Sequence, residues 1–132
     1  MENIKISELS VGDWVRYDRG TDAVQIMGIY VRNNQECVVM SDSYFPDGVI
    51  GFVECIKPIP LTPEILEKNG FSHNGQKWYT PELFTLERWS KGWTIVIACS
   101  CGDYVCEVCT IKYVHQLQHA LRLAGVGKEV VL

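Results

Sequence analysis

The stretch WTIVIACSCGDYVCEVCTIKYVHQLQHALRLAG, residues 93–125, predicts a strand, a tight turn, a second strand and an amphipathic helix in succession. Apolar and β-branched residues alternate over 93–99, as in a half-buried strand. Residues 100–103 have turn chemistry, and 104–108 can return antiparallel to the first strand. The apolar face of the helix must pack on something, and the preceding hairpin is the simplest partner.

The predicted helix spans residues 111–124, with Thr110 as its N-cap and Gly125 as its left-handed terminator. At about 100° per residue, one face is apolar and the other is polar. The polar face contains Lys112, His115, His119 and Arg122. We therefore expect both histidines of this helix to be exposed to solvent.

The first half of the chain predicts a small antiparallel barrel of the Src-homology type over residues 1–58. Four short apolar segments are separated by turn residues, and Asn33-Asn34 is a hairpin signal. Gly28 interrupts the second segment and predicts a bulge or bend. The predicted strands cover residues 14–17, 24–31, 36–41 and 49–56.

The second half, residues 59–132, predicts an antiparallel meander with two helices. Pro58 and Pro60 mark the boundary because proline restricts the backbone before it and lacks an N–H donor. Thr62 then caps a short helix, and residues 76–108 form the meander. The fold class is α+β, and one continuous sheet is the alternative. Residues 129–132 are either an edge strand or a frayed tail.

Composition limits the classes of partner. The chain has 132 residues and a net charge of −4, and residues 1–60 contain nine Asp/Glu against five Lys/Arg. This acidity argues against nucleic acid, and it fits either a basic protein partner or a solvated surface. No apolar run is long enough to span a membrane. Without a signal-peptide pattern at the N-terminus, we expect a cytoplasmic protein with reduced thiols.

Four cysteines in the hairpin pose the question of a metal. Cys99, Cys101, Cys106 and Cys109 are the candidate zinc ligands. Structural zinc is commonly held by paired Cys-x2-Cys motifs, and only the second pair has this spacing. Cys99 also continues an apolar strand face, so the pattern favours free thiols and no cofactor. A mixed site of Cys106 and Cys109 with both helix histidines is a further alternative.

Aromatic residues of the first half are the candidate binding residues. Small barrels of this type grip extended peptides with surface aromatics, although strand aromatics are more often core. Tyr44 and Phe45 are the strongest candidates because they lie in a predicted turn, where an apolar pair packs on the barrel end or meets a partner. Trp14 and Tyr17 in the first strand are the others.

Three motifs in the same order resemble a family of small uncharacterised proteins from Bacteroides-type genomes, encoded in prophages and mobile elements. They are VGDWV (residues 11–15), PIPLTPEILEKNGF (58–71) and IKYVHQLQ (111–118). The resemblance covers most of the chain and assigns no catalytic residue. It implies an accessory protein of phage or mobile-element origin in a bacterial host.

Together these observations predict a non-catalytic protein-interaction module that acts on a bacterial or phage protein. No nucleophile–base arrangement, phosphate-binding loop or metalloprotease motif is present in the sequence. A small enzyme that depends on zinc or on a thiol is one alternative. A structural homo-oligomer that associates through the helix or the terminal segment is another.

Overall fold

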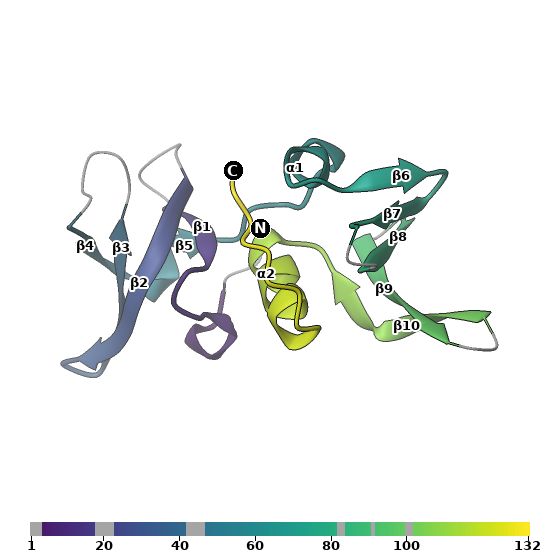
Figure 1. Cartoon of the computed structure of the whole chain (residues 1–132). Helices are drawn as coiled ribbons and strands as arrows, with labels where there is room; N and C mark the ends of the chain where they lie inside the picture. Colours follow the sequence, from purple (N-terminus) through teal and green to yellow (C-terminus); the bar gives the residue numbers. More distant parts are fainter. Residues whose placement is uncertain (1–3, 18–22, 42–46, 82–83, 91, 100–101) are drawn as a thin grey trace. The chain divides into compact units, whose positions relative to one another are not determined.

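The structure is a computed structural model of the chain (Figure 1). It describes residues 4–17, 23–41, 47–81, 84–90, 92–99 and 102–132, with the backbone alone for 97–99 and 102–109. The chain divides into two compact units, Met1–Ile59 and Pro60–Leu132. Each unit contains one five-stranded antiparallel sheet, and both α-helices belong to the second. The fold is therefore α+β, as the sequence predicts.

The first unit contains five strands and two 3-10 helices, in the order η1 (Ile6–Glu8), β1 (Trp14–Tyr17), β2 (Ala23–Arg32), β3 (Gln35–Ser41), β4 (Val49–Phe52), η2 (Val53–Cys55) and β5 (Ile56–Lys57). The sheet order is β4-β3-β2-β1-β5. Strands β4 and β5 are the two edges and do not pair with each other in the described part of the chain. A closed barrel is therefore not seen, and that part of the prediction stays a prediction.

One face of this sheet forms the core of the first unit. The buried residues of the cluster are Ile4, Leu9, Val15, Val24, Ile26, Val38, Met40 and Ile56. Tyr17, Ile29 and Val53 pack against its margin. Because side chains alternate between faces along a strand, the intervening residues lie on the opposite face.

Strand β2 contains a bulge next to Gly28, as predicted. Ile26 pairs with Met40 and Gly28 pairs with Val39, so Met27 is an extra residue on β2. The neighbouring hairpin turn at Asn33 and Asn34 has φ angles of 51° and 62°. Asparagine tolerates this left-handed conformation better than most residues, which explains the pair.

The second unit begins with α1 (Pro63–Lys68), whose N-cap is Thr62 as predicted. The Ile65 N–H donates to the Thr62 hydroxyl at 3.3 Å. The sheet follows, with strands β6 (Ser72–Asn74), β7 (Lys77–Tyr79), β8 (Thr85–Trp89), β9 (Gly92–Cys99) and β10 (Gly102–Ile111). Its order, β10-β9-β8-β7-β6, confirms the predicted meander and adds β6, which the sequence did not indicate.

Aromatic side chains fill the centre of this meander. The Trp78 and Trp93 rings meet edge to face at 5.6 Å between centroids, and both side chains are buried. The Arg88 guanidinium lies 5.4 Å from the centroid of Trp93, within cation–π range. Leu86 of β8 is fully buried beside them.

Helix α2 (Val114–Leu123) begins later than predicted. Ile111 is still in β10 and pairs with Trp93, so Thr110 cannot be the N-cap. The helix is instead started by Gln116, whose side-chain oxygen accepts from the backbone N–H groups of Lys112 and Tyr113 at 2.8 and 3.1 Å. The capping side chain therefore lies inside the helix, whereas the sequence pattern predicted a cap from a residue before the helix.

The predicted exposure of the helix histidines is wrong for His115. His115 is only 2% exposed, and His119 is half-buried. The His115 ring stacks on Tyr113 with a centroid distance of 6.0 Å. The buried side of α2 contains His115 and Gln118 as well as the apolar residues, so it is wider than the apolar stripe alone.

The terminal segment is neither an edge strand nor a frayed tail. Val131 exchanges two hydrogen bonds with the Asn69 side chain, both at 2.8 Å. Asn69 is 4% exposed and also donates to the Ile65 carbonyl at 2.8 Å. The terminal segment is therefore held by hydrogen bonds to the Asn69 side-chain amide, where an edge strand would bond to a neighbouring strand. No helix in the described residues is long and apolar enough to cross a membrane.

Candidate functional site

Two of the four binding residues predicted from the sequence, Trp14 and Tyr17, belong to the described part of the chain. Tyr44 and Phe45 lie outside the described residues. Trp14 and Tyr17 are both half-buried on β1, but three positions apart along a strand they lie on opposite faces. Tyr17 packs against the core, whereas Trp14 pairs with Gln25 on the other side. A binding role for these four residues stays a prediction.

A different surface of the first unit is apolar and exposed. We call it the outer apolar face, and it consists of Met27, Tyr30, Val39, Ile50 and Phe52. Directly paired residues of an antiparallel ladder share a face. Tyr30 pairs with Cys37 and Cys37 with Phe52, while Val39 pairs with Ile50. These rows run across β2, β3 and β4 on the face opposite the core.

The degree of exposure distinguishes this face from ordinary packing. Met27, Ile50 and Phe52 are 45%, 55% and 44% exposed. Met27 belongs to the face because a Cβ built on Gly48 would lie 3.4 Å from its sulfur and 2.9 Å from Val39. Large apolar side chains scattered singly on a surface are normal, but neighbouring ones on adjacent strands indicate a contact surface.

Cys37 lies between the two aromatic residues of the face and is 2% exposed. Its S–H group donates to the Gln35 carbonyl at 3.6 Å. A buried thiol of this kind behaves as a small apolar residue. Cys37 is the central residue of the cross-strand row whose two outer residues are Tyr30 and Phe52.

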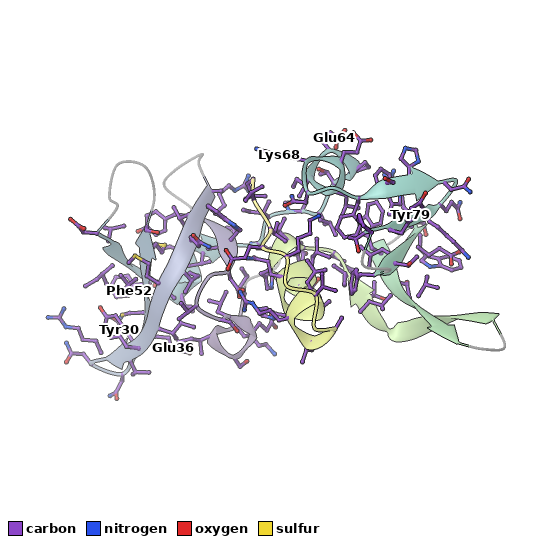
Figure 2. The ribbon with its side chains drawn as sticks, in the orientation of Figure 1. Tyr30, Glu36, Phe52, Glu64, Lys68 and Tyr79 are labelled. Atoms are coloured by element: carbon purple, nitrogen blue, oxygen red, sulfur yellow. The ribbon has the colours of Figure 1, made fainter. Side chains whose placement is uncertain are left out.

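A small pocket adjoins one end of the outer apolar face. Its volume is about 210 Å³, and it is lined by Asn34, Gln35, Glu36, Phe52, Val53 and Glu54. Figure 2 shows Tyr30, Glu36 and Phe52 at the same end of the first sheet. The pocket is thus lined by one aromatic residue and two acidic residues.

The acidic residues next to β4 give this surface its charge. Glu36 and Glu54 line the pocket, and Asp47 is exposed just before β4 begins. Within the described residues, neither pocket carboxylate makes an ion pair. One cation, Arg32, is also exposed here and pairs with Gln35 of the pocket. The three carboxylates outnumber it, so the border of the apolar face is negative on balance, which selects against acidic partners.

The side chains of the four clustered cysteines lie outside the described residues, but the backbone register bears on a shared site. Cys99 pairs with Gly102, whereas Cys106 pairs with Ile95, four residues further along β9. At about 3.3 Å per residue this separates Cys99 from Cys106 by roughly 13 Å along the ladder. Two sulfurs on one zinc lie within about 4.6 Å of each other. The register therefore disfavours a single four-cysteine site.

The described part of the chain contains no group of three or more His, Cys, Asp or Glu side chains suited to a metal. The expectation that the four cysteines are free thiols and bind no zinc stays a prediction, because the side chains of the hairpin are not among those described.

Sequence reasoning missed the outer apolar face, although a signal for it exists. Residues 37–40 are apolar at four consecutive positions, and Val49, Ile50 and Phe52 are apolar on both sides of β4. A strand with one solvated face normally alternates apolar and polar residues. Continuous apolar strands in a sheet this small indicate that the second face is also covered or used.

Comparisons with protein-family models, with curated protein sequences and with solved structures find no significant match to this chain.

Proposed function

We propose that this chain is a non-catalytic protein-interaction module of phage or mobile-element origin that binds a bacterial or phage protein. The observation that carries the proposal is the outer apolar face. Ile50 and Phe52 on β4 and Met27 on β2 are about half exposed on one face of the same sheet, where water contact is costly and burial by a partner is favourable.

The arrangement of strands supports a binding role for the first unit. The order β5-β1-β2-β3-β4, with a single 3-10 turn before the last strand, is typical of small Src-homology-type barrels. Such barrels present sheet surfaces and loops to extended segments of other proteins. On this interpretation the first unit is a curled barrel whose outer surface makes the contact.

The origin and the class of partner rest on the sequence motifs. The segments 11–15, 58–71 and 111–118 resemble proteins encoded in bacterial prophages and mobile elements. Accessory proteins of this kind work inside the bacterial host, which supports a cytoplasmic location and a host or phage protein as the partner. The acidity of residues 1–60 adds a preference for a basic surface.

Affinity capture from a lysate of the bacterial host tests the proposal with matched variants. The bait is the full chain, either wild type or with Ile50→Ser and Phe52→Ser together. Leu123→Ser, which changes a side chain that is 89% exposed in the second unit, is the control. We expect a stoichiometric partner with the wild type and the control, and its loss with the double variant. Equal recovery by all three baits would refute the outer apolar face as the binding surface.

A further inference from the structure

We infer that the occupant of the outer apolar face is a basic, extended segment of a partner protein that adds as a strand to the free edge of β4. The inference rests on the proposed function and specifies the chemistry of its partner. It combines three features of the first unit, namely an apolar edge strand, an apolar face beside it and an acidic pocket at its end.

The first feature is the edge itself. Strand β4 is at one end of the sheet order, and in the described part of the chain its backbone pairs only with β3. An edge strand offers N–H and C=O groups in a row to any further strand. Natural edges are usually protected by charges or proline, but the four residues of β4 are Val49, Ile50, Gly51 and Phe52.

The second feature sets which side chains an added strand would bring. Ile50 and Phe52 point to the outer apolar face, so every second side chain of the added strand would lie beside them. Gly51 lies on the other face, where an added Cβ would come within 2.6 Å of the Met40 side chain. The added strand therefore needs apolar residues on one side only, next to Ile50 and Phe52.

The third feature sets the charge. At the Phe52 end of β4, the residues that line the pocket include Glu36, Glu54 and Phe52. An ammonium or guanidinium group meets both the carboxylates and the ring favourably. A lysine or arginine that follows the apolar positions of the partner strand would enter this pocket.

The same charges argue against a second copy of this chain as the occupant. Two β4 strands paired antiparallel about their common centre would bring Asp47, just before β4 of one copy, toward Glu54 in η2 of the other. Like charges brought together at an interface oppose association. A partner with cations at these positions would be attracted electrostatically, whereas a second copy of this chain would be repelled.

Selection from a displayed library of random dodecapeptides, against the full chain, tests the chemistry. We expect enriched peptides to combine alternating apolar residues with lysine or arginine, and synthetic copies to bind more weakly at high salt. The joint change Glu36→Gln and Glu54→Gln should weaken binding about tenfold at low salt. The control, Glu64→Gln with Glu67→Gln on the exposed side of α1, should leave binding unchanged. Enrichment without basic residues, or no enrichment, would overturn the inference.

Amide hydrogen exchange of the full chain with the tightest peptide tests the mode of binding. Strand addition should slow exchange at the β4 backbone amides that point away from β3. Protection confined to other strands would contradict strand addition. Dimers in light scattering that disappear with Ile50→Lys would assign the edge to a second copy instead. Capture of a host protein through Ile50 and Phe52 by an acidic or neutral segment would leave the proposed function standing and refute the basic strand.

Discussion

The hydrogen bonds of Asn69 allow a quantitative prediction about how the terminal segment is held. The side chain makes three of them, one to Ile65 and two to Val131, all at 2.8 Å. At roughly 1 kcal/mol net for each bond, Asn69→Ala should lower the free energy of unfolding by about 3 kcal/mol. Asn69→Asp should be no better, because a carboxylate cannot donate to the carbonyl oxygens of Ile65 and Val131.

A double-mutant cycle isolates the part of this loss that belongs to the tail. In a chain that ends at Lys128, only the bond to Ile65 is left for Asn69→Ala to remove, so the cost should fall to about 1 kcal/mol. The expected coupling is therefore about 2 kcal/mol. Urea unfolding followed by tryptophan fluorescence measures it, since Trp78 and Trp93 are buried in the same unit. A coupling below about 0.5 kcal/mol would refute the attachment of the tail to Asn69.

Further predictions concern the second unit and its hairpin. Thr62→Ala should cost about 1 kcal/mol in urea unfolding, with Thr62→Ser nearly neutral, because only the hydroxyl that accepts from Ile65 is lost. Gly75→Ala should cost about 1–2 kcal/mol because φ is +65° at this position, although nothing lies within 4 Å of the new Cβ. The control Gln76→Ala, at the exposed neighbouring position, should change stability by less than about 0.5 kcal/mol. Leu86→Ala, at a fully buried position, should cost about 3 kcal/mol, and no change in the urea midpoint would contradict the described core. Chelation should leave the thermal midpoint unchanged and elemental analysis should find far less than one zinc per chain, whereas one tightly held zinc would restore the metal site of Cys99, Cys101, Cys106 and Cys109.

Local sequence signals predicted those parts of the fold that depend on neighbouring residues. The hydroxyl of Thr62, the left-handed turn at Asn33-Asn34 and the bulge beside Gly28 each act within a few positions of the chain. Alternating apolar residues likewise predicted the strands of the meander. These features can be predicted without knowing which distant residues pack against them.

Features that depend on distant residues were not predictable in this way. Helix α2 starts late because Ile111 is held in the sheet by Trp93, which lies eighteen positions earlier in the chain. Asn69, at the end of α1, bonds to Val131, which lies 62 positions away in the chain. The outer apolar face was missed for a similar reason, since it arises only when β2, β3 and β4 are placed side by side.

The bulge in β2 also determines where the first unit can change in length during evolution. Core residues before it have even numbers, Val24 and Ile26, and the next residue against the core is Ile29, an odd one. Loss of Met27 would restore a regular ladder and leave each of these three on its present face. Loss of Gln25 or Tyr30 would instead exchange the two faces over part of the strand. A single-residue deletion is thus compatible with the fold at the bulge, but at neighbouring positions it would turn core residues toward the outer apolar face.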